Sequence, residues 1–226
     1  MQKVKLSDLQ KDILSYFGRT EFGRNFYWTG GTLLAYHYLY NRQSVDIDFF
    51  SENLFADNDY LIFINQMKAD LKISKIDFVI EMNRRMFLIH RKKEIVKMEI
   101  VYFPFPAVSK LIALKEFNVR ASSLVDLMSN KILSAYQRNE PKDAFDLYSY
   151  LSNKPKYRIE KLIDFAIKKF GVEIEPLNLF VKLNDLSEKI DTLKPLLLVS
   201  DKSLKIKMKA FFQIEFNRFM GKVIGK

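Results

Sequence analysis

The chain has 226 residues, of which 48% are hydrophobic, contains no cysteine and carries a formal net charge of +10. This composition allows one good core or two modest ones, and it excludes a disordered protein, a disulfide scaffold and a cysteine zinc site. The first residues lead into an amphipathic pattern rather than an apolar signal segment and no apolar run could span a bilayer, so we expect a cytoplasmic protein with acidic partners, such as a nucleotide, an RNA or an acidic protein.

The first predicted elements surround a pair of glycines. Apolar residues recur with a helical period over residues 7–17, and this helix is expected to cover a sheet. A short strand at 26–28 then leads into Gly30 and Gly31, and a helix follows at 32–39. Backbone amides at a glycine turn before a helix can approach a phosphate, so the pattern is consistent with an anion site. The alternative is a tight turn that needs glycine only for a positive φ.

Residues 42–50 are predicted to form a strand with two carboxylates on one face. Side chains alternate along a strand, so Arg42, Ser44, Asp46 and Asp48 would share one surface, and the apolar face would be buried. Adjacent carboxylates repel each other, and a cation such as Mg²⁺ offsets that repulsion. The alternative is an exposed edge strand with two solvated aspartates.

A helix at 57–72 and strands at 75–82, 86–92 and 94–103 are expected next, the last two as a hairpin. Glu99 lies on the more polar face of the third strand. Asp77, Glu81 and Glu94 are rival acidic residues nearby, and Glu99 has apolar flanks within a predicted strand. Glu99 is the candidate among the four because it also matches the family resemblance given below.

The composition becomes helical from Ser123 onward, and we predict an α/β domain at 1–120 and a helical domain at 121–226. In the first helix, Lys131 and Arg138 can face one side; the alternative is a pair of surface cations. The next helix opens at a proline, and Asp143 and Asp146 lie three residues apart on one face. Asp143 could equally stabilise the N-terminus of that helix.

The remaining helices, at 158–170, 175–190 and 202–219, are predicted to form a bundle. Residues 201–226 carry seven basic and two acidic residues. This stretch could be a nucleic-acid footprint, but interleaved apolar residues favour a packed helix with a lysine-rich solvated face.

Together, these motifs resemble the AbiEii toxin family within the DNA polymerase β-like nucleotidyltransferase superfamily. The matching segments are Gly-Gly-Thr-x-Leu from Gly30, Arg-x-Ser-x-Asp-Ile-Asp-Phe-Phe from Arg42, the strand with Glu99, and the stretch from Asp126 to Leu147. The resemblance covers roughly residues 25–150. Two departures are a spacing of fourteen residues between Gly31 and Asp46, and Lys142 before Asp143 where many relatives have arginine.

The resemblance implies an α/β (α+β) nucleotidyltransferase-fold mixed sheet with flanking helices, followed by a C-terminal helical bundle. It also implies a Mg²⁺-dependent nucleotidyltransferase, with Mn²⁺ as the other candidate metal, that acts by a two-metal mechanism in a cleft between the two domains. In this assignment Asp46, Asp48 and Glu99 bind metal, and Lys131 and Asp143 are the other catalytic residues. The implied substrate-binding residues are Gly30, Gly31, Thr32, Arg42, Ser44, Lys131, Arg138 and Asp146.

The biological role implied by the resemblance is that of a toxin in a bacterial toxin–antitoxin or phage-defence pair. Such a toxin adds nucleotides from a nucleoside triphosphate (NTP) to an RNA acceptor, tRNA above all, and is opposed by a separately encoded antitoxin. Two alternatives stay open. One is an NTP-binding regulatory protein that does not transfer nucleotides, and the other is an enzyme that nucleotidylates a protein or a small molecule.

Overall fold

The computed structural model describes residues 4–198 and 200–224, and the chain divides after Ser123 into two compact units. The first three residues of the predicted amphipathic N-terminal stretch and the last basic residue, Lys226, lie outside the described residues. The two units are described separately below.

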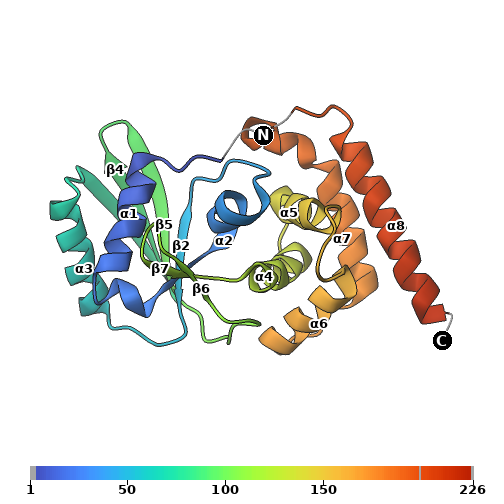
Figure 1. Ribbon diagram of the computed structural model, residues 1–226, viewed down its shortest axis with the longest axis horizontal. Coiled ribbons are helices and arrows are strands. Elements are labelled where there is room, and N and C mark those ends of the chain that lie inside the picture. The colour runs from blue at the N-terminus through green and yellow to red at the C-terminus, as the bar shows by residue number, and fades with distance from the viewer. Residues whose placement is uncertain (1–3, 199, 225–226) are drawn as a thin grey trace. The chain divides into compact units, whose positions relative to one another are not determined.

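The first unit is built on a mixed seven-stranded sheet with the order β3-β4-β5-β2-β1-β7-β6 (Figure 1). Strand β2 pairs antiparallel with β1 and parallel with β5, and β1 pairs parallel with β7, whereas the β3-β4, β4-β5 and β6-β7 pairs are antiparallel. The prediction of a mixed sheet is therefore confirmed. The strands are β1 (Tyr27–Thr29), β2 (Ile47–Ser51), β3 (Lys75–Glu81), β4 (Arg84–Arg91), β5 (Glu94–Tyr102), β6 (Ile112–Leu114) and β7 (Val119–Ala121).

Two helices, α1 (Asp8–Arg19) and α3 (Asp57–Asp70), pack on the apolar face of this sheet (Figure 1). A capping box between Ser7 and Gln10 fixes the start of α1 by satisfying backbone N–H groups that have no intrahelical partner. Phe17 of α1 stacks on Phe49 of β2 with ring centroids 3.5 Å apart, and Phe63 of α3 meets Phe17 edge-on at 4.7 Å. The prediction that the first helix covers the sheet is confirmed.

Strand β2 is shorter than predicted and begins at Ile47. Its neighbour β1 ends at Thr29, and Gly30, with φ +81°, turns the chain into a helix, so antiparallel pairing on that side cannot extend further. Arg42, Ser44 and Asp46 therefore belong to the segment before the strand, and the prediction that they share a strand face is wrong. Val45 is correspondingly 60% exposed rather than part of the core.

The helix after β1 also differs from its prediction. It begins at the first glycine as α2 (Gly30–Leu33) and continues as a π-helix (Leu34–Leu39). Tyr40 ends it in the left-handed conformation, with its N–H bonded to the carbonyl of Ala35. Between β1 and β2 the glycines are thus the first turn of a helix rather than a separate turn before one.

The second unit consists of helices, as the sequence predicted (Figure 1). The long basic stretch forms one packed helix, in which Met208 and Phe212 are buried. Five of its cations pair with acidic side chains of the same unit: Lys205, Lys207, Lys209, Arg218 and Lys222. These observations favour the packed helix over a nucleic-acid footprint. The helices are α4 (Leu124–Gln137), α5 (Pro141–Leu151), α6 (Ile159–Phe170), α7 (Pro176–Glu188), a 3₁₀ segment (Ile190–Leu196) and α8 (Leu204–Ile224).

No helix within the described residues is both long and apolar enough to cross a lipid bilayer.

Candidate active site

One crowded point of the first unit lies where β1 meets β2. Thr29 pairs with Asp48 across these strands, so the next residue, Gly30, begins its helix directly beside the Asp48 carboxylate. A Cβ at Gly30 would collide with Oδ2 of Asp48, and the φ of +81° at this position is one that residues with a side chain rarely adopt. Only glycine can bring the backbone this close to the carboxylate.

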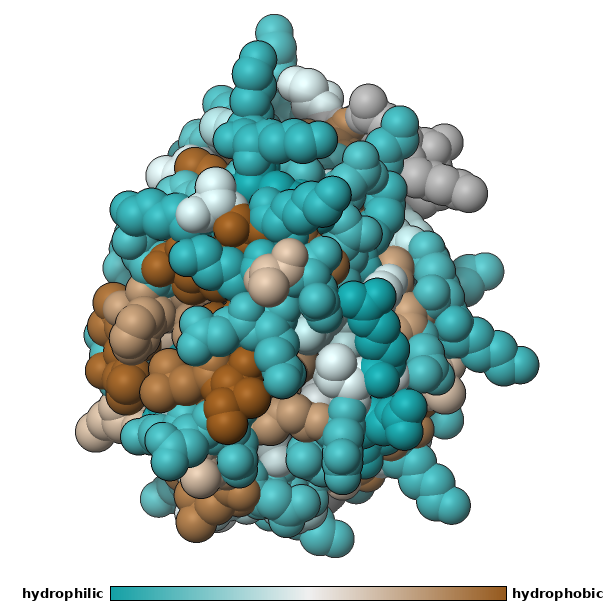
Figure 2. Space-filling model, turned by 90° about the vertical axis from the view of Figure 1, so that its left-hand side faces the viewer, coloured by the Kyte–Doolittle hydropathy of each residue, from teal (hydrophilic) through white to brown (hydrophobic). Residues whose placement is uncertain are grey.

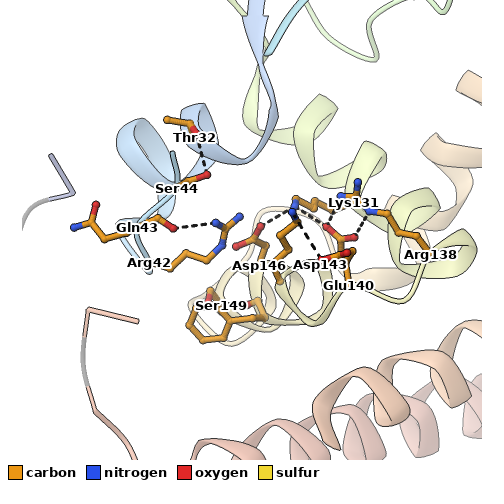
Figure 3. A network of polar contacts seen from close by, with 12 residues as sticks. Thr32, Arg42, Gln43, Ser44, Lys131, Arg138, Glu140, Asp143, Asp146 and Ser149 are labelled. Atoms are coloured by element: carbon orange, nitrogen blue, oxygen red, sulfur yellow. Dashed lines mark hydrogen bonds and ion pairs between the residues drawn. The ribbon is translucent and has the colours of Figure 1, made fainter. Parts of the chain in front are cut away.

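Asp48 and Glu99 lie opposite each other on neighbouring parallel strands, β2 and β5. Residues paired in this way project from the same face of a sheet, so both carboxylates occupy one surface. Asp46 immediately precedes β2, and its backbone carbonyl accepts a hydrogen bond from the Thr32 hydroxyl. The same hydroxyl hydrogen-bonds to the Ser44 hydroxyl at 2.9 Å, which ties the segment before β2 to α2 (Figure 3). The register therefore places Asp48 beside Glu99, and Asp46 lies two residues before Asp48 in the segment that leads into β2.

Lys97 is a residue of this site to which the sequence analysis gave no role. Its Nζ lies 2.6 Å from Oε1 of Glu99. The hydrogen bond to Glu99 raises the pKa of Lys97 more than burial lowers it, and the charges of Glu99, Asp46 and Asp48 raise it further. The signal was present in the sequence, because residues two apart on a strand share a face. The ammonium group of Lys97 therefore pairs with Glu99 and is also influenced by the charges of Asp46 and Asp48.

The fit of these residues to a divalent cation can be tested on their chemistry. Carboxylate oxygens are the ligands that Mg²⁺ prefers, and the site already favours a positive charge, as the raised pKa of Lys97 shows. As the side chains stand, no three histidine, aspartate or glutamate residues in the described part of the chain converge on one metal position. The donor set thus fits a divalent cation that is also coordinated by substrate and water, not a closed protein cage.

Arg42 and Ser44 approach the backbone of the second glycine. A Cβ at Gly31 would lie 2.9 Å from NH2 of Arg42 and 3.5 Å from Oγ of Ser44. The Arg42 side chain is almost fully buried and donates a hydrogen bond to the carbonyl of Gln43 at 3.1 Å (Figure 3). The free N–H groups of a first helical turn, a hydroxyl and a guanidinium thus lie within one short segment, which is a donor set suited to phosphate oxygens.

The second unit contains its own cluster of charged residues, centred on Lys131 of α4 (Figure 3). Its Nζ lies 2.7 Å from Oδ1 of Asp143 and 2.8 Å from Oδ2 of Asp146, both on α5 and both completely buried. Arg138 binds the Asp143 carboxylate with two hydrogen bonds, of 2.6 and 2.9 Å. Burial alone would raise the pKa of Asp143, but Lys131 and Arg138 outweigh it and hold that pKa below 3.8. The predicted charged faces of α4 and α5 therefore contact each other through these ion pairs.

The rival acidic residues lie elsewhere on the sheet. Asp77 belongs to the outer strand β3, where its carboxylate lies 2.8 Å from Nζ of Lys75. Glu81 ends that strand, and Glu94 accepts a hydrogen bond from the N–H of Leu9 at the start of α1. Among the four acidic residues considered, the sheet register places only Glu99 opposite Asp48.

The sequence analysis also missed two structural features. Strands β6 and β7 have three residues each, too few for an alternating pattern, and they are recognisable only through the pairing of β7 with β1. A second buried ion pair joins Lys169 to Asp126 at 2.7 Å, with Asn130 at 2.9 Å from the same ammonium. These partners come from helices 43 positions apart in sequence, so no local pattern indicated them.

The family model for the AbiEii nucleotidyl transferase toxin, type IV toxin–antitoxin system, matches residues 12–224. The chain belongs to the AbiEii family. Two solved structures share its fold at 16% sequence identity. JHP933 from Helicobacter pylori has a TM-score of 0.58, with 98% of this chain and 97% of that one covered; MenT4, a nucleotidyltransferase toxin from Mycobacterium tuberculosis, has a TM-score of 0.55, with 92% and 82% covered. Curated proteins give no match.

The AbiEii family assignment makes this chain a toxin-type nucleotidyltransferase with the nucleotidyltransferase fold, and it implies an antitoxin partner and an NTP substrate. Nucleotidyltransferases generally use divalent metal ions. In this chain, the residues described above are the candidates for binding the NTP and the metal ion.

Proposed function

We propose that this AbiEii protein transfers a nucleotide from an Mg²⁺-bound NTP to a hydroxyl group of an RNA acceptor, with tRNA as the leading candidate. The observation that carries the proposal is the pairing of Asp48 with Glu99 on one sheet face, beside the Gly30 backbone and with Asp46 at the edge of β2. The net charge of +10 supports an acidic acceptor.

In this proposal Asp46, Asp48 and Glu99 hold the divalent cation, for which Mn²⁺ is the second candidate. When bound, the cation supplies neutralisation of charge on the triphosphate and its pyrophosphate leaving group. Glu99 accepts the proton of the attacking hydroxyl or orients that hydroxyl. The N–H groups of Gly30 and Gly31, together with Ser44 and Thr32, bind phosphate oxygens, and their geometry is set before substrate arrives.

In the second unit, the proposal gives a role to Lys131 and the residues around it. Asp143 and Asp146 orient its ammonium, and Arg138 in turn orients Asp143 through a two-point contact. We assign Lys131 to nucleotide binding and charge stabilisation, Asp143 to its alignment, and Arg138 and Asp146 to support of both. Arg42 supports the phosphate-binding segment from its buried position.

Incubation of the protein with each labelled NTP and total RNA tests the proposal. We expect label in RNA that requires a divalent cation and disappears in D48N. Asp77→Asn is the matched control, because it removes a carboxylate from the same sheet without touching the Asp48–Glu99 pair. Label confined to protein or to a small molecule would favour an enzyme that nucleotidylates that kind of acceptor. NTP binding without any product would favour a regulatory protein.

A further inference from the structure

The outer strand of the sheet, β3, has an unusual composition for an edge. Phe78, Val79 and Ile80 are consecutive and each is about half exposed, and Met82 in the following turn is 96% exposed. Figure 2 shows hydrophobic side chains gathered among polar ones on the face of the molecule that carries α3 and the outer strands. Natural edge strands are usually protected by charges, prolines or bulges, and an apolar edge is a template for pairing.

The backbone of β3 is oriented for such pairing. The N–H of Ser74 bonds to the carbonyl of His90, so His90 directs its backbone groups toward β3. Backbone direction alternates along a strand, and the register pairs Phe78 with Phe87, at a position where β4 points away from β3. The N–H and C=O groups of Ile76, Phe78 and Ile80 therefore point to the open side of the sheet.

We propose that a second copy of this chain occupies this edge, with the two β3 strands antiparallel about a two-fold axis at Phe78. In that register Lys75 of each copy lies opposite Glu81 of the other, Ile76 opposite Ile80, and the two Phe78 residues face each other. The pairing joins unlike charges at both ends and apolar residues on the α3 side, and it adds about six backbone hydrogen bonds.

Neighbouring registers are electrostatically unfavourable. A two-fold axis at Asp77 would place the two Asp77 carboxylates opposite each other, and an axis at Val79 would place Asp77 opposite Glu81. Like charges directly opposite across a strand pair are destabilising. The charge pattern of β3 is thus complementary to itself in the Phe78-centred register, which favours a second copy over an unrelated strand.

Engineered cysteines test this register directly, because the full chain contains none. Phe78→Cys should form a disulfide-linked dimer under mild oxidation, since directly paired residues have Cα atoms about 5.5 Å apart, within the range of a disulfide. Ile80→Cys is the matched control: its two copies would be roughly 13 Å apart and should not cross-link. Equal cross-linking of the two variants, or cross-linking of I80C alone, would overturn the proposal.

Charge reversal supplies the second test, read by sedimentation over a concentration series. K75E and E81K should each weaken the dimer by about tenfold, because each puts like charges opposite at both ends. The double variant K75E/E81K should restore the wild-type dissociation constant, and an equimolar mixture of the two single variants should form heterodimers.

A third variant addresses the backbone. Phe78→Pro removes an outward-facing N–H together with the Phe78 ring, and edge strands tolerate such a proline, so it should yield a folded monomer by circular dichroism and sedimentation. A wild-type protein that is monomeric at every concentration, a dimer that survives F78P, or a double charge variant without restored affinity would each contradict the proposal. Binding of a foreign peptide strand to monomeric protein would assign the edge to a different partner.

Discussion

The acidic site of the first unit and the Lys131 cluster of the second unit use the same residue types in opposite ways. In the first, Lys97 and Arg84, both partly exposed, lie 2.6 and 3.5 Å from the Glu99 carboxylate, and the charges of Asp46 and Asp48 also act on Lys97. In the second, Lys131 and Arg138 balance two fully buried aspartates. The cations of the first group are partly open to solvent, whereas the aspartates of the second are completely buried.

This difference separates two physical roles. Neighbouring carboxylates at a partly exposed site repel each other, so they add little to the stability of the fold and are available to bind a cation. Balanced and buried charges hold geometry, and removing one partner leaves the other without compensation. Substitutions in the first group should therefore reduce activity far more than stability, and substitutions in the second group should reduce stability first.

The largest expected effect is a loss of nucleotide-transfer rate in the Asp48→Asn variant. Loss of this carboxylate should lower nucleotide transfer by about 10³-fold or more, because charge stabilisation at the reacting phosphate depends on it. Its free energy of unfolding should change by less than about 1 kcal/mol, since one like-charge repulsion disappears with it. Single-turnover assays and urea denaturation measure the two quantities. A D48N protein that unfolds readily would place Asp48 among structural residues instead.

Asp143→Ala should show the reverse behaviour. It leaves Lys131 and Arg138 without their shared partner, and we expect the free energy of unfolding to fall by about 3–5 kcal/mol. Thermal and urea unfolding measure this effect. The exposed Asp164→Ala on α6 is the matched control and should cost less than about 1 kcal/mol. Unchanged stability in D143A would show that the buried cluster does not support the helical unit.

Gly30→Ala should combine both behaviours. Its positive φ costs about 1–2 kcal/mol for a residue with a side chain, and the added Cβ must also displace Asp48. Gly171→Ala is a control for the first term alone, because Gly171 also has a positive φ but an added Cβ there meets no atom within 4 Å. We expect G171A to lose only stability and G30A to lose activity as well. Equal activity losses in the two variants would show that activity does not depend on the close approach of Gly30 to Asp48.

The smallest expected effect is a pH dependence of stability that arises from Lys97. Its pKa is raised above 10.5 in the folded protein, so its stabilising contribution is fully present below pH 10.5 and is lost as the pH rises through the folded value. The side chain is 42% exposed, so the contribution should be below about 1 kcal/mol. The difference in unfolding free energy between wild type and K97M should stay constant from neutral pH and shrink at strongly alkaline pH. A constant difference throughout would show that Lys97 does not interact with the carboxylates.

Much of the fold was predictable because its signals are local. The helical period of its apolar residues predicted the helix that is α1 in the structure, and extended runs of residues predicted β3, β4 and β5. Strand β2 was predicted too long because the sequence does not show where its neighbour β1 ends. That boundary depends on Gly30, whose positive φ appears only in the folded chain.

The candidate site divides in the same way. Asp46, Asp48 and Glu99 were selected from local pattern and family resemblance, and Lys131, Arg138, Asp143 and Asp146 from helical spacing together with that resemblance. Their catalytic roles stay predictions until variants are measured. The pairing of Lys97 with Glu99 was not recognised, although both lie on one face of the same strand. The effect of Asp48 on Lys97 depends on the pairing of β2 with β5, which the sequence does not show.

The sequence by itself therefore determined the order and type of most elements, the acidic residues worth testing and the charge pattern of β3, because each is encoded in residues near one another in the chain. Tertiary structure alone decided that Asp48 lies opposite Glu99, that β1 pairs with β7 and that β3 is left at the edge of the sheet. These are relations between distant segments, and they depend on strand register and packing that no local pattern contains.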